Sequence, residues 1–82
     1  MRRFILLLTA VVSLYLSENI DNGKQIQLSD GSTYEIAPDD VIRSALWIFP
    51  LPIEIQASDD PDYPIKLINS NLGSSVKAKR LP

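Results

Sequence analysis

The sequence contains no cysteine and no histidine. Without cysteine the chain forms no disulfide bond, offers no thiol nucleophile and cannot bind zinc through thiolates. Without histidine it cannot carry a Ser-His or Cys-His catalytic pair, a histidine metal ligand or the usual switch near neutral pH. Its 82 residues are enough for one small domain. We therefore expect no enzyme, no cofactor and no metal.

The sequence also has little excess of charge of either sign. Eight Lys and Arg residues nearly balance ten Asp and Glu residues, which leaves a net charge of −2. Removal of residues 1–17 would take away two arginines and leave six basic against ten acidic residues, a net charge of −4. Nucleic acids and anionic membranes attract proteins with clustered positive charge. We therefore expect neither of them as the main partner.

The N-terminus has the layout of a secretory signal peptide. Met1–Arg3 is short and basic, Phe4–Val12 is apolar and uncharged, and small residues follow at Ser13 and Ser17. This order of basic, apolar and small residues is typical of a segment that is removed during export. We assign residues 1–17 to a signal peptide, so the protein is expected to be periplasmic or secreted.

The cleavage site and the fate of this segment leave alternatives open. A cut after Ser13 places Val11 three residues before the bond, whereas a cut after Ser17 places the bulky Tyr15 there, which favours Ser13. As an uncleaved anchor, residues 4–16 would form a helix of only about 20 Å, against about 30 Å of hydrocarbon. A third interpretation makes the segment part of the fold.

The hydrophobic pattern changes to the strand period after the N-terminal segment. Residues 18–23 (ENIDNG) are polar and turn-prone, and we predict a linker there. Residues 24–82 form the predicted β-domain, because apolar and polar residues alternate along most of it. The alternation predicts five short strands, each with one apolar face: 25–28, 33–36, 51–57, 63–67 and 75–79.

The first hairpin turn can be predicted in detail. A two-residue loop at Asp30-Gly31 would pair Ile26 with Glu35 and place an apolar residue opposite a charged one. A three-residue loop, Ser29-Asp30-Gly31, pairs Ile26 with Tyr34 and keeps the apolar residues on one face. Gly31 then occupies the third loop position, which requires a positive φ and produces a G1 bulge.

A short helix is predicted between the second and third strands, from about Asp39 to Leu46. Asp39 or Asp40 can cap its N-terminus, and Pro50 and Pro52 prevent its continuation. Four apolar residues lie on one side of this helix: Val41, Ile42, Ala45 and Leu46. Five strands and one helix predict a small all-β fold, an SH3-like or OB-like antiparallel barrel or rolled sheet.

Several of these residues resemble a group of uncharacterised small exported proteins of chlamydia-like and other Gram-negative bacteria. Their shared pattern is L-x-D-G-S-x-(Y/W)-x-I-x-P-x-D, followed by a Trp and a strand of the I-x-I type. Residues 28–40, Trp47 and residues 53–55 match it here, and Tyr63-Pro64 and Asn69 belong with it. The resemblance implies an exported, all-β and non-enzymatic protein, and it indicates no ligand.

The run Leu46, Trp47, Ile48 and Phe49 is the main candidate for a partner-binding surface. Four consecutive apolar residues in an extended segment cannot all point inward, so some of them are expected at the surface. Trp47 has two interpretations, a plug of the core or part of an exposed aromatic patch. Asp30 and Gly31 are assigned a structural role in the hairpin turn.

Other charged residues are assigned to structure. We interpret five acidic residues as helix caps and solvated turns, with weak calcium binding and catalysis as alternatives: Asp39, Asp40, Asp59, Asp60 and Asp62. Lys77, Lys79 and Arg80 on the last strand are interpreted as protection of a sheet edge, with phosphate or lipid headgroup binding as the alternative.

The resulting hypothesis is a non-enzymatic exported β-domain that acts as a protein-interaction or structural module of the cell envelope. Its contacts would use an open strand edge, the residues 46–49, or both. Its partner would be another envelope protein or a second copy of the chain, and it would meet a membrane only through an uncleaved N-terminal segment. The alternatives are a glycan- or peptide-binding module around Trp47 and a secreted effector.

Overall fold

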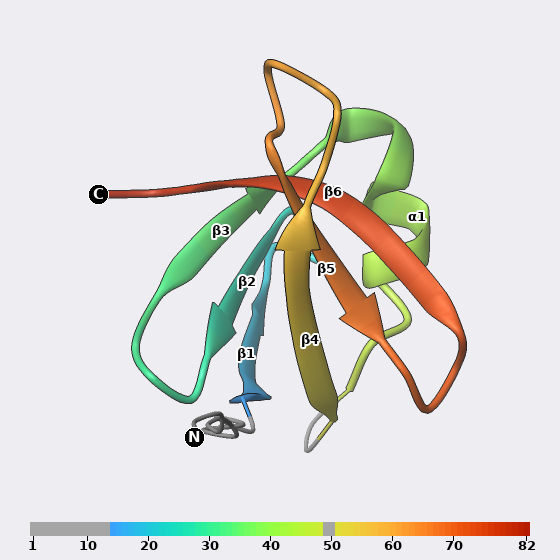
Figure 1. Ribbon diagram of the computed structural model, residues 1–82. Coiled ribbons are helices and arrows are strands. Elements are labelled where there is room, and N and C mark those ends of the chain that lie inside the picture. The colour runs from blue at the N-terminus through green and yellow to red at the C-terminus, as the bar shows by residue number, and fades with distance from the viewer. Residues whose placement is uncertain (1–13, 49–50) are drawn as a thin grey trace, which may run out of the picture.

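The computed structural model describes residues 14–48 and 51–82, and these form six antiparallel strands closed into one barrel (Figure 1). Around the barrel the strands follow the order β1-β2-β3-β6-β5-β4. A 3₁₀ turn, η2, and a short helix, α1, connect the two three-stranded halves. In chain order the elements are β1 (Leu14–Ile20), β2 (Gln25–Leu28), β3 (Thr33–Ile36), η2 (Pro38–Asp40), α1 (Val41–Ser44), β4 (Pro52–Ala57), β5 (Ile65–Asn69) and β6 (Ser74–Arg80).

The predicted architecture, an all-β antiparallel barrel with one short helix, is confirmed. The predicted number of strands is wrong, because the described part of the chain contains a sixth strand, β1. Strand β1 includes residues 14–17 of the predicted signal peptide and residues 18–20 of the predicted linker. Residues 21–24 form the turn before β2. Residues 1–13 of the predicted signal peptide, which was expected to form an N-terminal signal helix, lie outside the described residues.

Strand β1 was missed because its period of two follows directly on an apolar run. Leu14 and Leu16 pack on the core, whereas Tyr15 and Ser17 face solvent. Read together with Phe4–Val12, the two leucines extend the apolar stretch of a signal peptide and hide the alternation. In the fold, β1 closes the barrel by pairing with β2 on one side and with β4 on the other.

The hairpin between β2 and β3 confirms the predicted three-residue loop. Ile26 pairs with Tyr34, and the Leu28 N–H donates to the Ser32 carbonyl at 2.9 Å. Gly31 has a φ of 88°, as the third loop position requires. The backbone N–H of Ser32 donates to the Asp30 carboxylate at 2.9 Å. Together with a hydrogen bond from the Ser32 hydroxyl, which is the larger cause, this contact lowers the pKa of Asp30.

The core lies inside the barrel and receives side chains from all six strands and from the segment after α1. Because successive residues of a strand point to opposite faces, the strands contribute alternate residues to the core. β4 departs from this pattern, because Ile53 is its one buried residue and Ile55, predicted on the same apolar face, is exposed. Trp47 is the largest fully buried side chain. The buried cluster consists of Leu16, Ile26, Leu28, Tyr34, Ile36, Trp47, Ile53, Leu67, Val76 and Ala78.

The connection between the barrel halves differs from the predicted helix in two respects. Of the four apolar residues predicted on one side of the helix, Val41 packs against the core, whereas Ile42, Ala45 and Leu46 are exposed. The buried residue of α1 is Ser44. Neither Asp39 nor Asp40 caps the helix through its side chain. The Asp40 carboxylate instead accepts hydrogen bonds from Arg43 and from the backbone N–H of Lys77 on β6. Polar contacts therefore hold α1 against the barrel together with Val41, which packs against the core.

Candidate functional site

The outer side of α1 and the residues after it form an exposed apolar surface, which we call the α1 face: Ile42, Ala45, Leu46 and Ile48. Ile42 is 76% exposed, Leu46 75% and Ile48 73%, the highest values among the large hydrophobic residues of the described chain. Single exposed apolar residues are normal, whereas several of them on one short segment make that segment a candidate interaction surface. Two members, Leu46 and Ile48, belong to the predicted run, and Phe49 lies outside the described residues.

Trp47 occupies the core position between the two exposed members of that run. It is 1% exposed, and its indole N–H donates to the Ser74 hydroxyl at 3.0 Å. Its carbonyl accepts a hydrogen bond from the Asn19 side chain at 2.8 Å. The structure thus places Trp47 as the plug of the core, the first of its two interpretations. This anchoring turns the neighbouring Leu46 and Ile48 outward.

The inner side of α1 is fixed by the turn between β1 and β2. The Ser44 hydroxyl donates to the Gly23 carbonyl at 2.7 Å, and the Asn19 amide donates to the Ser44 carbonyl at 2.9 Å. Gly23 has a φ of 92°, and a Cβ at this position would lie 2.4 Å from the backbone nitrogen of Ala45. Only glycine permits this close approach. Sequence reasoning missed this contact, although Asp21-Asn22-Gly23 is a strong turn signal.

A second set of contacts ties α1 to β6. Asp40 is buried, and one carboxylate oxygen accepts the backbone N–H of Lys77 at 2.8 Å. Arg43 pairs with the same carboxylate and donates from Nε to the Ser75 carbonyl at 3.3 Å. Buried carboxylates are stabilised when they are paired and hydrogen-bonded. The segment that carries the α1 face is therefore attached both to the β1–β2 turn and to β6.

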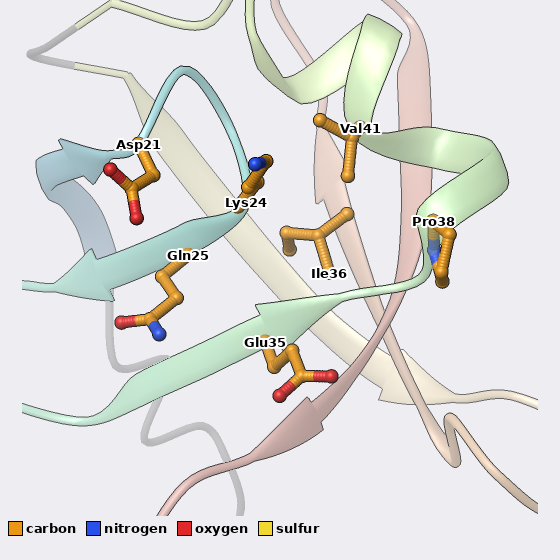
Figure 2. A pocket seen from close by; sticks show the side chains of 7 residues that line it. All are labelled: Asp21, Lys24, Gln25, Glu35, Ile36, Pro38 and Val41. Carbon is orange, nitrogen blue, oxygen red and sulfur yellow. The ribbon is translucent and has the colours of Figure 1, made fainter.

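A pocket of about 460 Å³ lies beside α1, between the β1–β2 turn and the ends of β2 and β3 (Figure 2). Apolar side chains form one part of its wall and charged or amide side chains the other. Both acidic and basic side chains line the pocket. The Oε2 atom of Glu35 lies 3.8 Å from Nζ of Lys79 on β6. The lining residues are Asp21, Lys24, Gln25, Glu35, Ile36, Pro38 and Val41.

Asp60 in the β4–β5 loop makes contacts both within the loop and with β6. Asp60 accepts the backbone N–H of Asp62 at 2.9 Å and forms an ion pair with Lys77 at 3.2 Å. The Asp62 hydrogen bond and the Lys77 contact lower the pKa of Asp60, and Asp60 raises the pKa of Lys77. Within residues 14–48 and 51–82, no three His, Cys, Asp or Glu side chains gather in a way that suits a metal ion.

The interpretation of the last strand as a protected sheet edge is wrong. Strand β6 pairs with β3 on one side and with β5 on the other, so it lies inside the closed sheet. Lys79 lies 5.6 Å from the centre of the Tyr63 ring and beside Glu35. The weakest junction of the barrel is β1–β4, which pairs through two residue pairs, Leu14 with Ile53 and Tyr15 with Pro52.

Comparisons with protein-family models, with curated proteins and with solved structures found no match to this chain. Across the described residues, none of the helices is long and apolar enough to span a membrane. The function is therefore inferred from the geometry of the two surface features, the α1 face and the pocket beside it.

Proposed function

We propose that this chain is a non-enzymatic, exported protein-interaction module of the bacterial cell envelope, and that it contacts a partner protein through the α1 face. The observation that carries the proposal is the exposure of Ile42, Leu46 and Ile48 on a segment held rigidly from behind. Burial of each side chain by a partner would contribute about 1.5–3 kcal/mol. A rigid surface loses little conformational entropy on binding, so more of this energy remains as affinity.

The size of the α1 face favours a different protein over a second copy of the chain. Each of its three large side chains carries roughly 100 Å² of apolar surface, judged from the usual relation between area and transfer free energy. Two copies placed face to face would bury about 600 Å² through these residues, whereas stable interfaces begin near roughly 1,200 Å². A partner that receives the α1 face in an apolar groove adds area on its own side.

The alternative of an aromatic binding platform loses its main residue. A platform needs the flat face of an aromatic ring at the surface, and Trp47 is buried beneath the α1 face. Two other aromatic residues, Tyr34 and Tyr63, are buried and half-buried respectively. The interaction module therefore accounts better for the exposed residues.

Photo-crosslinking tests the proposal in the native host. A benzophenone amino acid placed at Leu46 is expected to form one discrete crosslinked product with another protein. The same probe at Leu72, an exposed residue in the turn between β5 and β6, is the matched control and is expected to form none. A product of twice the chain's mass would identify self-association, and an absence of products at Leu46 would contradict the proposal.

Quantitative binding then measures the contribution of the α1 face. The variants Ile42→Ser and Ile48→Ser are expected to weaken binding of the crosslinked partner at least ten-fold each, because about 1.4 kcal/mol corresponds to a factor of ten. Their circular dichroism spectra should match the parent, since both side chains are exposed. Unchanged affinity in both variants would place the contact elsewhere on the molecule.

A further inference from the structure

Strand β1 is joined to the rest of the barrel from its first residue onward. Leu14 pairs with Ile53 and Tyr15 with Pro52, and these are the pairs that close the sheet between β1 and β4. The backbone N–H of Leu16 donates to the Leu51 carbonyl at 2.8 Å, and the Leu16 side chain belongs to the core. The residues from 14 to 16 are thus part of the folded domain.

The β2–β3 turn is attached to the same residues. The Ser29 N–H donates to the Tyr15 carbonyl at 2.8 Å, and the Tyr15 N–H donates to the Ser29 hydroxyl at 3.1 Å. A chain that began at Glu18 would lose these bonds, the buried side chain of Leu16 and every pair between β1 and β4. The barrel would open along one side and expose the unpaired edge of β4.

The two possible export cleavage sites therefore have opposite consequences for the fold. We infer that an exported chain is cleaved at the peptide bond between Ser13 and Leu14 and that the bond after Ser17 stays intact. Water is the co-reactant: hydrolysis of the bond leaves a carboxylate on Ser13 and an ammonium on Leu14. The inference rests on the export part of the proposed function and is independent of the α1 face.

The sequence on the two sides of each bond supports the same choice. Val11 and Ser13 place small residues three positions and one position before the proposed cut, as signal peptidases require. A cut after Ser17 would place Tyr15 at the earlier of these positions. The fold and the peptidase preference are separate observations, and both select the bond that leaves β1 whole.

The experiment expresses the full chain in a Gram-negative host and measures the intact mass and the N-terminal sequence of the recovered protein. The expected product begins at Leu14 and contains residues 14–82. A product that begins at Glu18 would overturn the inference while leaving export correct. Full-length protein in every fraction would overturn both the cleavage site and export, and the crosslinking result at Leu46 would be unaffected.

Two single substitutions form a matched pair for the same assay. Ser13→Tyr places a bulky side chain directly before the proposed bond and is expected to accumulate the precursor. Ser17→Tyr does the same at the other bond and is expected to be processed like the parent, since Ser17 is exposed on β1 and tolerates a larger side chain. Processing blocked by Ser17→Tyr and unaffected by Ser13→Tyr would overturn the inference.

Discussion

The β2–β3 hairpin and α1 show two ways of attaching a segment to the same barrel. In the hairpin, Ile26, Leu28 and Tyr34 point into the core and the polar residues face outward. In α1 the order is reversed, since Ser44 and the neighbouring Asp40 are buried while Ile42 and Leu46 face solvent. Apolar burial holds the hairpin, whereas α1 is held by hydrogen bonds together with a single apolar contact, that of Val41 with the core. The comparison explains how the apolar residues on and after α1 stay exposed to solvent.

The same substitution in the two regions gives the largest contrast. Leu28→Ala removes a fully buried side chain and is expected to lower the free energy of unfolding by about 2–5 kcal/mol. Leu46→Ala removes an exposed side chain and is expected to change it by about 0.5 kcal/mol or less. Urea unfolding of both variants measures the difference. Equal losses would show that Leu46 packs on the core and would break the comparison.

Two glycines sharpen the role of the β1–β2 turn. Gly23 and Gly31 both have a positive φ, but their surroundings differ. A Cβ at Gly23 would clash with the Ala45 backbone, whereas a Cβ at Gly31 would meet no atom within 4 Å. Gly31→Ala is expected to cost about 1–2 kcal/mol from backbone strain alone. Gly23→Ala adds steric overlap and is expected to cost about 2–4 kcal/mol. Similar losses in both variants, measured by thermal unfolding, would show that α1 does not depend on this close approach.

The Ser44 hydroxyl provides a smaller test of the polar attachment. Ser44→Ala removes the hydrogen bond to the buried Gly23 carbonyl and is expected to cost about 1–2 kcal/mol. Ser70→Ala, in the exposed turn after β5, is the control and is expected to be near neutral. A neutral Ser44→Ala in chemical unfolding would mean that the remaining contacts of Asn19 and Asp40 hold α1 by themselves.

The contrast between the two regions also explains which parts of the fold could be predicted from the sequence. The register of the β2–β3 hairpin followed from the apolar period and from Gly31, because both act through local geometry. The orientation of α1 could not be predicted in this way. It depends on Asn19, Gly23 and Lys77, whose contacts with α1 cross long distances in the sequence.

The candidate site was predicted in part for the same reason. An apolar run of four residues requires some of them to face outward, and Leu46 and Ile48 do so. The run alone did not identify Ile42, because its apolar spacing is also that of a helix packed on a core. The pocket beside α1 had no sequence signal, since its lining comes from the β1–β2 turn, two strands and two connecting segments.

The ion pair between Asp60 and Lys77 is expected to give the smallest effect, because both side chains are partly exposed and solvent screens the pair. The pKa of Asp60 is lowered by the Asp62 N–H and by Lys77, so its contribution to stability is present above the ordinary carboxyl pKa of about 4. That contribution is lost as the pH falls through the lowered pKa of the folded state. The pKa of Lys77 is raised by Asp60, so its contribution is present below its ordinary pKa and is lost as the pH rises through the raised value.

Asp60→Asn should therefore melt at a lower temperature than the parent near neutral pH, and the difference should vanish in strong acid, where the parent carboxylate is protonated. Glu54→Gln, an exposed carboxylate change on β4, is the control and should show no such convergence. Melting temperatures measured from neutral pH to about pH 2 at low salt test this expectation. If the difference in melting temperature persists unchanged in acid, the substitution acts through the hydrogen bonds of the loop. The Asp60–Lys77 ion pair would then not contribute to holding β6 against the β4–β5 loop.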